Sequence, residues 1–402
     1  MAPNGSVGLC KEAAKLYHEA CNESIRLAPC LKLSRLTEAI KLYHQALKSV
    51  ETNNEAASIW KNMAVSYQKL CQATDNSDFK YLCWAANQSV ECFLKAITIG
   101  NKTLSNTEWL IVVKAKLTSF VESIADSTEF TRREMIEIFR AMAKPFEQFS
   151  ASEFANFRMD GTAELFFRLA DEYFKSSIEM IDEGKNALIC ETTNQPVIDY
   201  TKHIKLKPGF TKAKSELANC QRPLKMAQNF AVSDGIKEMI DELMEKVFLE
   251  ECAIDSALLR FQADALLDQH VMNSEEVNMD GVYQALDMYR LSVVAAREVD
   301  VEAEAITLCR MGKLFTQFKL GDEEKAHQCF FRSVQLATSM LPRNLDREEW
   351  YIEAKDAVEL HQKEKLAKEE KEWNEKRKPF IEELKVSQSL VSIVVHSSFY
   401  FR

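Results

Sequence analysis

Glycine and proline are scarce in this chain of 402 residues, which has only 10 glycines and 8 prolines. Apolar residues make up 46% of the chain and charged residues 28%. This balance is typical of long, well-ordered helices with few tight turns, and it argues against disorder for most of the chain. The length is enough to bury more than one hydrophobic core, so we expect two or three helical subdomains.

Long apolar runs and an excess of positive charge are also missing. Without a run of about 20 apolar residues, no membrane-spanning helix is expected. The first residues, MAPNGSVGLCKEAAK, lack the apolar core of a secretory signal, which favours a cytoplasmic location. The 51 basic residues are outnumbered by 61 acidic ones, giving a net charge of −10. This balance predicts no general affinity for nucleic acid.

The motifs of common enzymes and metal sites are absent as well. The sequence has no GxxxxGKS/T, GxGxxG, HExxH or GxSxG motif, which removes the commonest phosphate, zinc and hydrolase sites. Its 11 cysteines include no CxxC pair, and their helical surroundings indicate reduced, buried thiols. His18 and His44 occupy equivalent places in two similar segments, which duplication explains without a metal. We therefore expect no catalysis, no metal and no cofactor.

What the sequence does contain is a repeated helical pattern. Large and small residues alternate on one face of a helix within Ala57–Leu70, at these positions: Trp60, Met63, Ala64, Tyr67 and Leu70. The preceding segment carries Ala39, Tyr43 and Ala46 at offsets of zero, four and seven. Residues at these offsets share one helix face, and the small ones let a neighbouring helix approach. Together the two segments predict a helical hairpin.

This hairpin resembles a tetratricopeptide repeat. The first-helix spacing recurs at Leu308, Met311, Gly312, Phe315 and Phe318, and more weakly at Phe166, Leu169, Ala170 and Tyr173. The second-helix spacing recurs in four triples: Ala13, Tyr17, Ala20; Ser89, Phe93, Ala96; Ala285, Tyr289, Ser292; and Ala326, Phe330, Ser333. The family's 34-residue period is broken. The resemblance implies an all-α fold: a right-handed array of antiparallel helical hairpins (a tetratricopeptide-like α-solenoid) with a long charged C-terminal helix.

The pattern divides the chain into five parts. Tetratricopeptide-like hairpins are expected at 1–125 and 231–343, with a charged helix at 344–385. Residues 126–230 form a phenylalanine-rich middle region whose helices we expect four prolines to interrupt: Pro145, Pro196, Pro208 and Pro223. An apolar, β-prone tail follows at 386–402. We interpret this tail as an alternative or truncated ending, with a segment that folds back on the body as the other interpretation.

In such arrays the exposed residues of the first helices line a concave groove. If this chain has the family's geometry, the N-terminal groove contains Lys11, Lys15, His18, Ser58, Lys61, Asn62, Val65 and Gln68. A groove that is basic within an acidic protein suits an acidic peptide or a carboxylate. The resemblance thus implies a non-catalytic scaffold or adaptor that binds a protein, an acidic peptide or a partner helix. The oligomeric state is left open.

Two alternatives are co-chaperones and trafficking adaptors. Some tetratricopeptide proteins hold the acidic tails of heat-shock chaperones with Lys and Asn residues, and Lys11 and Asn62 stand where two of that set would be. Lys15 replaces an Asn, however, and the helix around Thr107 and Ile111 lacks the expected basic residues. The charged helix could also lead to a J domain in a fuller form of the protein. A vesicle-trafficking adaptor like the soluble attachment proteins is the second alternative, which the Glu/Lys-mixed C-terminal helix does not favour.

Overall fold

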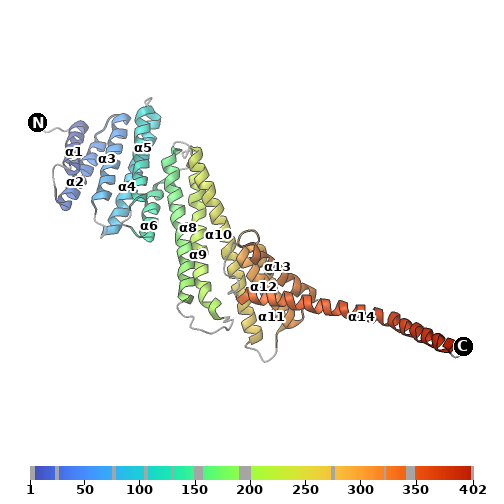
Figure 1. Cartoon of the computed structure of the whole chain (residues 1–402). Helices are drawn as coiled ribbons and strands as arrows, with labels where there is room; N and C mark the ends of the chain where they lie inside the picture. Colours follow the sequence, from blue (N-terminus) through green and yellow to red (C-terminus); the bar gives the residue numbers. More distant parts are fainter. Residues whose placement is uncertain are drawn as a thin grey trace. The chain divides into compact units, whose positions relative to one another are not determined.

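The computed structural model describes residues 5–22, 27–74, 78–103, 107–127, 130–148, 157–189, 201–272, 277–320, 323–340 and 349–399. Within these ranges every regular element is a helix and no strand occurs (Figure 1). The prediction of an all-α fold is confirmed. None of the helices in these ranges is both long enough and apolar enough to cross a membrane.

The chain forms two compact units. The N-terminal unit contains Met1–Val197 and Lys205–Glu251, and the C-terminal unit contains Ile198–Ile204 and Cys252–Arg402. The boundary at Glu251 falls inside one long helix, α10 (Asp234–Leu267). The five-part division inferred from the sequence remains a prediction.

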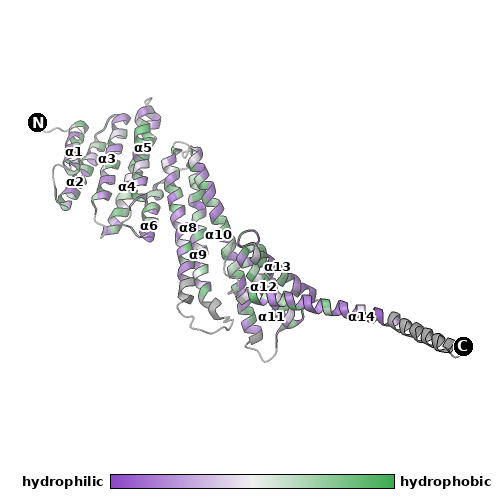
Figure 2. Ribbon diagram, viewed as in Figure 1, coloured by the Kyte–Doolittle hydropathy of each residue, from purple (hydrophilic) through white to green (hydrophobic). Residues whose placement is uncertain are grey.

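The N-terminal unit begins with two helix pairs. They are formed by α1 (Ser6–Cys21), α2 (Pro29–Lys48), α3 (Asn53–Ala73) and α4 (Phe79–Thr103). Ala13, Ala39 and Ala64 have no exposed surface, which is why the neighbouring helices can approach closely. Figure 2 shows apolar and polar residues alternating in bands along these helices, as expected when each helix buries one face.

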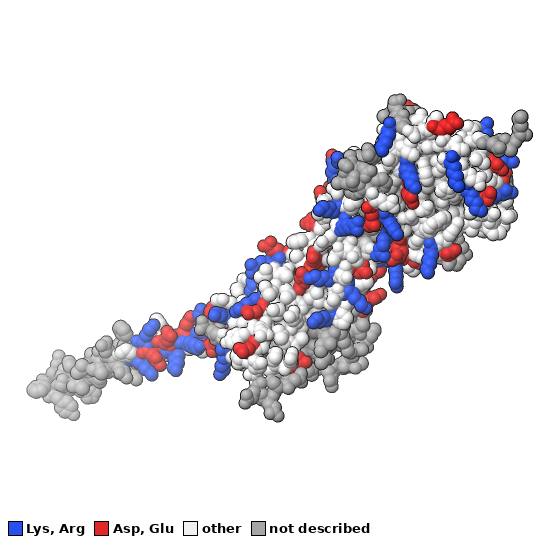
Figure 3. All heavy atoms as spheres, turned by 180° about the vertical axis from the view of Figure 1, so that it is seen from behind, with Lys and Arg blue, Asp and Glu red and all other residues white. Residues whose placement is uncertain are grey.

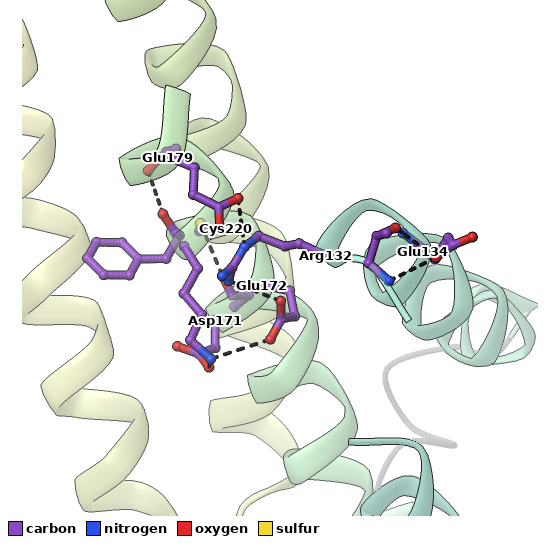
Figure 4. Close-up of polar contacts among 11 residues, drawn as sticks. Arg132, Glu134, Asp171, Glu172, Glu179 and Cys220 are labelled. Atoms are coloured by element: carbon purple, nitrogen blue, oxygen red, sulfur yellow. Dashed lines mark hydrogen bonds and ion pairs between the residues drawn. The ribbon is translucent and has the colours of Figure 1, made fainter. Parts of the chain in front are cut away.

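The middle of the N-terminal unit contains α5 (Thr107–Ala125), α6 (Arg132–Ala143), the 3₁₀ turn η2 (Lys144–Gln148) and α8 (Asp160–Ile189). Thr131 and Glu134 form a capping box that starts α6, satisfying backbone N–H groups that a helix start leaves free. From the first turn of α6, Arg132 reaches α8, where it pairs with Glu172 at 3.3 Å and Glu179 at 2.9 Å (Figure 4).

The prediction that prolines interrupt the middle helices is wrong for Pro208 and Pro223, because both lie inside α9 (Thr201–Phe230). Proline in a helix interior removes a hydrogen bond and costs about 3 kcal/mol. Burial of an apolar stripe offsets that cost, since most helix stability in proteins comes from packing. The buried residues of this stripe recur at helical spacing: Phe210, Ala213, Leu217, Cys220, Leu224 and Ala227. Pro196 lies outside the described residues.

The C-terminal unit contains the second half of α10, the short π-helical turn η4 (Asp268–Met272), α11 (Met279–Ala296), α12 (Val301–Phe318) and α13 (Glu323–Ser339). Its core includes Tyr289, Phe315 and Phe330. Gly312 allows α12 and α13 to pack closely, because a Cβ there would lie 2.8 Å from the Phe330 ring. The patterns at Leu308–Phe318 and Ala326–Ser333 predicted a pair of helices, and they lie in α12 and α13, which pack against each other.

The last helix, α14, runs from Glu349 to Phe399. Its first turns pack on α12 and α13, with Tyr351, Ala354 and Val358 buried. Further along, basic and acidic side chains are interspersed (Figure 3), as predicted for a charged helix. The helix continues past Lys385 to Phe399. β-branched residues lower helix propensity by less than about 1 kcal/mol each, which an established helix can absorb.

Candidate partner-binding groove

The candidate site lies between α1 and α3. Both helices start earlier than the sequence pattern indicates. α1 begins at Ser6, and α3 begins at Asn53 with the Thr52 hydroxyl accepting a hydrogen bond from the backbone N–H of Glu55 at 3.3 Å. An N-cap of this kind stabilises a helix by about 1 kcal/mol. The additional turns place more residues along the shared surface of the two helices.

A cavity of about 440 Å³ opens between these helices. Its lining comes from both: Ser6, Val7, Cys10, Lys11 and Ala14 on α1, and Asn54, Glu55, Ser58, Ile59 and Asn62 on α3. The volume falls within the range of pockets that bind small molecules or single peptide side chains. Val7 and Ile59 supply apolar surface, and the other lining residues include polar groups of both helices.

The structure brings part of the predicted residue set together. Lys11, Ser58 and Asn62 line the cavity. Lys15 and His18 are exposed on α1 beyond the cavity, and three half-buried α3 residues also lie outside its lining: Lys61, Val65 and Gln68. Their spacing along each helix still puts them on faces adjoining the cavity.

Burial and like charge act on one lysine of this surface. Burial lowers the pKa of Lys61, and the nearby Lys116 on α5 lowers it further. Within the described residues, neither Lys11, Lys15, Lys61 nor Lys116 forms an ion pair with a carboxylate. The surface around Lys61 therefore carries positive charge that no described carboxylate compensates directly.

One acidic group lies among these residues. Glu55 is exposed on the cavity lining, and burial together with the Glu55 charge raises the pKa of Cys10 above its ordinary value. The Cys10 thiol is consequently protonated at neutral pH and contributes as a small apolar group. This side of the cavity repels a second negative charge, so an anionic ligand is favoured toward Lys11 and the lysines beyond it.

Sequence reasoning missed several residues of this region. Ser6 and Val7 precede the residues whose spacing predicts the first helix, and Asn54 and Glu55 precede the Ala57–Leu70 segment. The signal that could have found the latter pair is Thr52 followed by Glu55, the spacing of a helix N-cap. Lys116 was missed because its proximity to Lys61 depends on how α5 packs beside α3.

The histidines of the two similar segments have separate environments. The His18 ring packs edge-to-face against the Tyr17 ring. The His44 ring packs edge-to-face against the Trp60 ring, with the two ring centroids 6.4 Å apart. No group of three or more His, Cys, Asp or Glu side chains in the described ranges is arranged to hold a metal ion.

Comparison with known proteins adds no identification. No protein-family model matches this chain, and no curated protein matches it.

Proposed function

We propose that this chain is a non-catalytic interaction scaffold, built as a right-handed tetratricopeptide-like array, that binds an acidic peptide in the groove between α1 and α3. One observation carries the proposal: a cavity of about 440 Å³ lies beside lysines that no described carboxylate neutralises. The recurring small residues support the array, since Ala13, Ala39 and Ala64 are all fully buried at helix contacts.

Charge supports an acidic ligand. A carboxylate placed near Lys61 and Lys116 would counteract the burial and the like charge that lower the pKa of Lys61. Hydrogen bonds between ammonium and carboxylate groups are about twice as strong as neutral ones. The ligand's negative charge would also be attracted from a distance, although salt screens such attraction beyond about 10 Å at 0.1 M. We expect binding to weaken as salt is added.

The cavity supports a peptide with an apolar side chain beside its carboxylates. Val7, Ala14 and Ile59 provide an apolar lining, which rewards burial at about 25 cal/mol per Å². Ser58 and Asn62 can hydrogen-bond a peptide backbone. An acidic peptide that carries one aliphatic residue therefore fits both parts of the surface.

Direct binding measurements test the proposal. A fluorescent peptide of glutamates with one central leucine, and its glutamine counterpart, are titrated with the full chain at two salt concentrations. The groove variant changes Lys11, Lys15 and Lys61 to Glu. A control variant changes Lys32, Lys41 and Lys48 of α2 to Glu, which alters net charge equally but outside the groove.

The unmodified chain and the control variant should bind the glutamate peptide, whereas the groove variant should not. Binding should weaken at the higher salt concentration. Equal affinity of the groove variant and the unmodified chain would overturn the proposal. So would equal affinity for the glutamine peptide, because the ligand's charge would then be irrelevant.

Binding of a chaperone's acidic tail is a second candidate. It is favoured by the fact that Lys11 and Asn62, the two residues that match the tail-binding pattern, line the same cavity. Lys15 and the α5 positions Thr107 and Ile111 depart from that pattern. A peptide with a free C-terminal carboxylate should then bind more tightly than its amidated form, which is a comparison of two peptides in the same assay.

A further inference from the structure

A second pocket lies in the middle of the N-terminal unit, among α6, η2, α8 and α9. Its volume is about 320 Å³. The inner wall is apolar and includes Phe146, Phe166, Leu169 and Met226. The lining also includes polar residues: Arg140, Glu147, Tyr173, Asn219 and Arg222. An apolar cavity with a few convergent polar groups is the usual form of a small-molecule site.

The phenylalanines hold this wall in place. Phe146 and Phe166 have ring centroids 5.4 Å apart in an edge-to-face arrangement, and Phe166 stacks on Phe230 at 5.6 Å. Aromatic contacts of this kind add about 0.5–1.5 kcal/mol each beyond the burial of their area. Phe146 and Phe166 therefore belong both to the buried core and to the pocket wall.

Tyr173 places an unused hydrogen-bond donor at this wall. Its side chain is only 6% exposed, and its hydroxyl oxygen accepts hydrogen bonds from Nε of Arg140 at 3.0 Å and Nη2 at 2.5 Å. The hydroxyl hydrogen has no acceptor among the described residues. A ligand oxygen in the pocket can accept a hydrogen bond from this hydroxyl.

Two guanidinium groups belong to the pocket lining, those of Arg140, which contacts this hydroxyl, and Arg222. Arg140 uses Nη1 for Glu137 at 2.6 Å, and Arg222 uses Nη2 for Glu147 at 3.2 Å. Each guanidinium has five N–H donors, so both keep donors free for a ligand. Because Glu137 and Glu147 already offset much of the positive charge, the site suits a single negative charge better than a doubly charged phosphate.

We propose that this pocket binds a small monocarboxylate with an apolar or aromatic body. The carboxylate accepts hydrogen bonds from the Tyr173 hydroxyl and from the free N–H groups of Arg140 and Arg222. The body lies against Phe146, Phe166 and Leu169. An uncharged apolar molecule would leave the Tyr173 donor unpaired. This site is separate from the α1/α3 groove and does not depend on the function proposed there.

The test is calorimetric titration of the full chain with 3-phenylpropionate and octanoate, each beside its neutral amide, 3-phenylpropanamide and octanamide. Tyr173→Phe removes the donor and keeps the ring, and Arg140→Gln removes the adjacent charge. Arg133→Gln removes a charge from an exposed α6 position outside the pocket lining and serves as the control. Losing a hydrogen bond to a charged group corresponds to about a tenfold loss of affinity or more.

We expect at least one carboxylate to bind at millimolar concentration or below, its amide to bind about tenfold more weakly, and both pocket variants to show a similar loss. Arg133→Gln should bind like the unmodified chain. If Tyr173→Phe or Arg140→Gln unfolds the chain, Arg222→Gln, whose side chain is 74% exposed, supplies the same comparison. Absence of binding by both carboxylates overturns the proposal, as does equal binding of acid and amide.

Discussion

Two tyrosines at the same place in the repeated pattern show how the two units differ. Tyr43 in the N-terminal unit and Tyr289 in the C-terminal unit are 2% and 1% exposed. Burial, with a contribution from Cys10, raises the pKa of Tyr43 to about 12. The Tyr289 hydroxyl instead donates a hydrogen bond to Asp264, a fully buried carboxylate on α10 that also accepts one from Arg310 on α12. The same motif thus packs the ring similarly but gives the hydroxyl different surroundings.

The C-terminal unit consequently has a charged interior. Arg260 lies near Asp264, and burial, together with repulsion from Arg310, lowers the pKa of Arg260 to about 10. Burial also opposes the charge of Arg310, but Asp264 and Tyr289 outweigh it and leave the pKa of Arg310 raised. A buried charge pair of this kind contributes little net stability, yet removing one partner is costly because the other stays buried without compensation.

The largest loss of stability is expected when one partner of this buried charge pair is removed. Asp264→Ala should destabilise the C-terminal unit by about 3–5 kcal/mol, because Arg310 would remain largely buried without its carboxylate. Asp287→Ala, which breaks an exposed pair with Arg290, should cost less than about 1 kcal/mol. Urea denaturation measures both, and hydrogen exchange of α11 amides assigns the loss to this unit. Equal small losses would mean that the buried network carries no such cost.

Exchanging the tyrosines tests the comparison directly. Tyr289→Phe should cost about 1.5–3 kcal/mol, since it removes a hydrogen bond to a buried charged group. Tyr43→Phe should cost clearly less, because no carboxylate of the described residues is bonded to its hydroxyl. The two variants are compared by urea denaturation under one condition. A larger loss for Tyr43→Phe would reverse our account of the two positions.

Removing a buried serine hydroxyl should destabilise the chain by a smaller amount, and by the same amount in both units. The buried hydroxyls of Ser89 and Ser333 donate to first-helix backbone carbonyls, at 2.9 Å to Ala64 and 2.7 Å to Ala305. Ser89→Ala and Ser333→Ala should each cost about 1 kcal/mol, while the exposed Ser119→Ala should cost little. Thermal melting of the three variants checks this. A clear difference between the two buried serines would show that the helix pairs are less alike than their pattern.

The smallest effect is a dependence on pH. Burial, the stacked His361 ring 4.0 Å away and Lys365 lower the pKa of His327, against an opposing effect of Glu324. Burial, Lys95 and Lys48 likewise lower the pKa of His44 in the other unit. Unfolding lets each ring take up a proton at its ordinary pKa of 6.5. The stability that each contributes is therefore complete above pH 6.5 and is lost as the pH falls below it.

NMR titration should find both imidazoles titrating below pH 6.5. In melts above and below that pH, His327→Gln should remove part of the pH dependence of the C-terminal unit only, and His44→Gln part of that of the N-terminal unit only. An imidazole that titrates above 6.5 would contradict the sign of its predicted contribution.

The sequence by itself determined the helices and their buried faces. The spacing of Trp60, Met63, Ala64, Tyr67 and Leu70 requires one apolar stripe on a 3.6-residue helix, and α3 buries all of these except the half-buried Trp60. Ser233 likewise has the residue type that favours a helix start, and its hydroxyl accepts a hydrogen bond from the N–H of Ile236 at 3.4 Å at the start of α10. Such signals are local, so neighbouring residues suffice to specify them.

Only the tertiary structure decided which polar groups meet. Asp264 and Arg310 are 46 residues apart, and Lys61 and Lys116 belong to helices whose contact no local pattern encodes. The pocket beside Tyr173 needs α6, α8 and α9 together, and α9 persists through Pro208 and Pro223 because its buried stripe offsets their cost. Periodicity specifies a face, whereas the partner of that face depends on the packing of the whole unit.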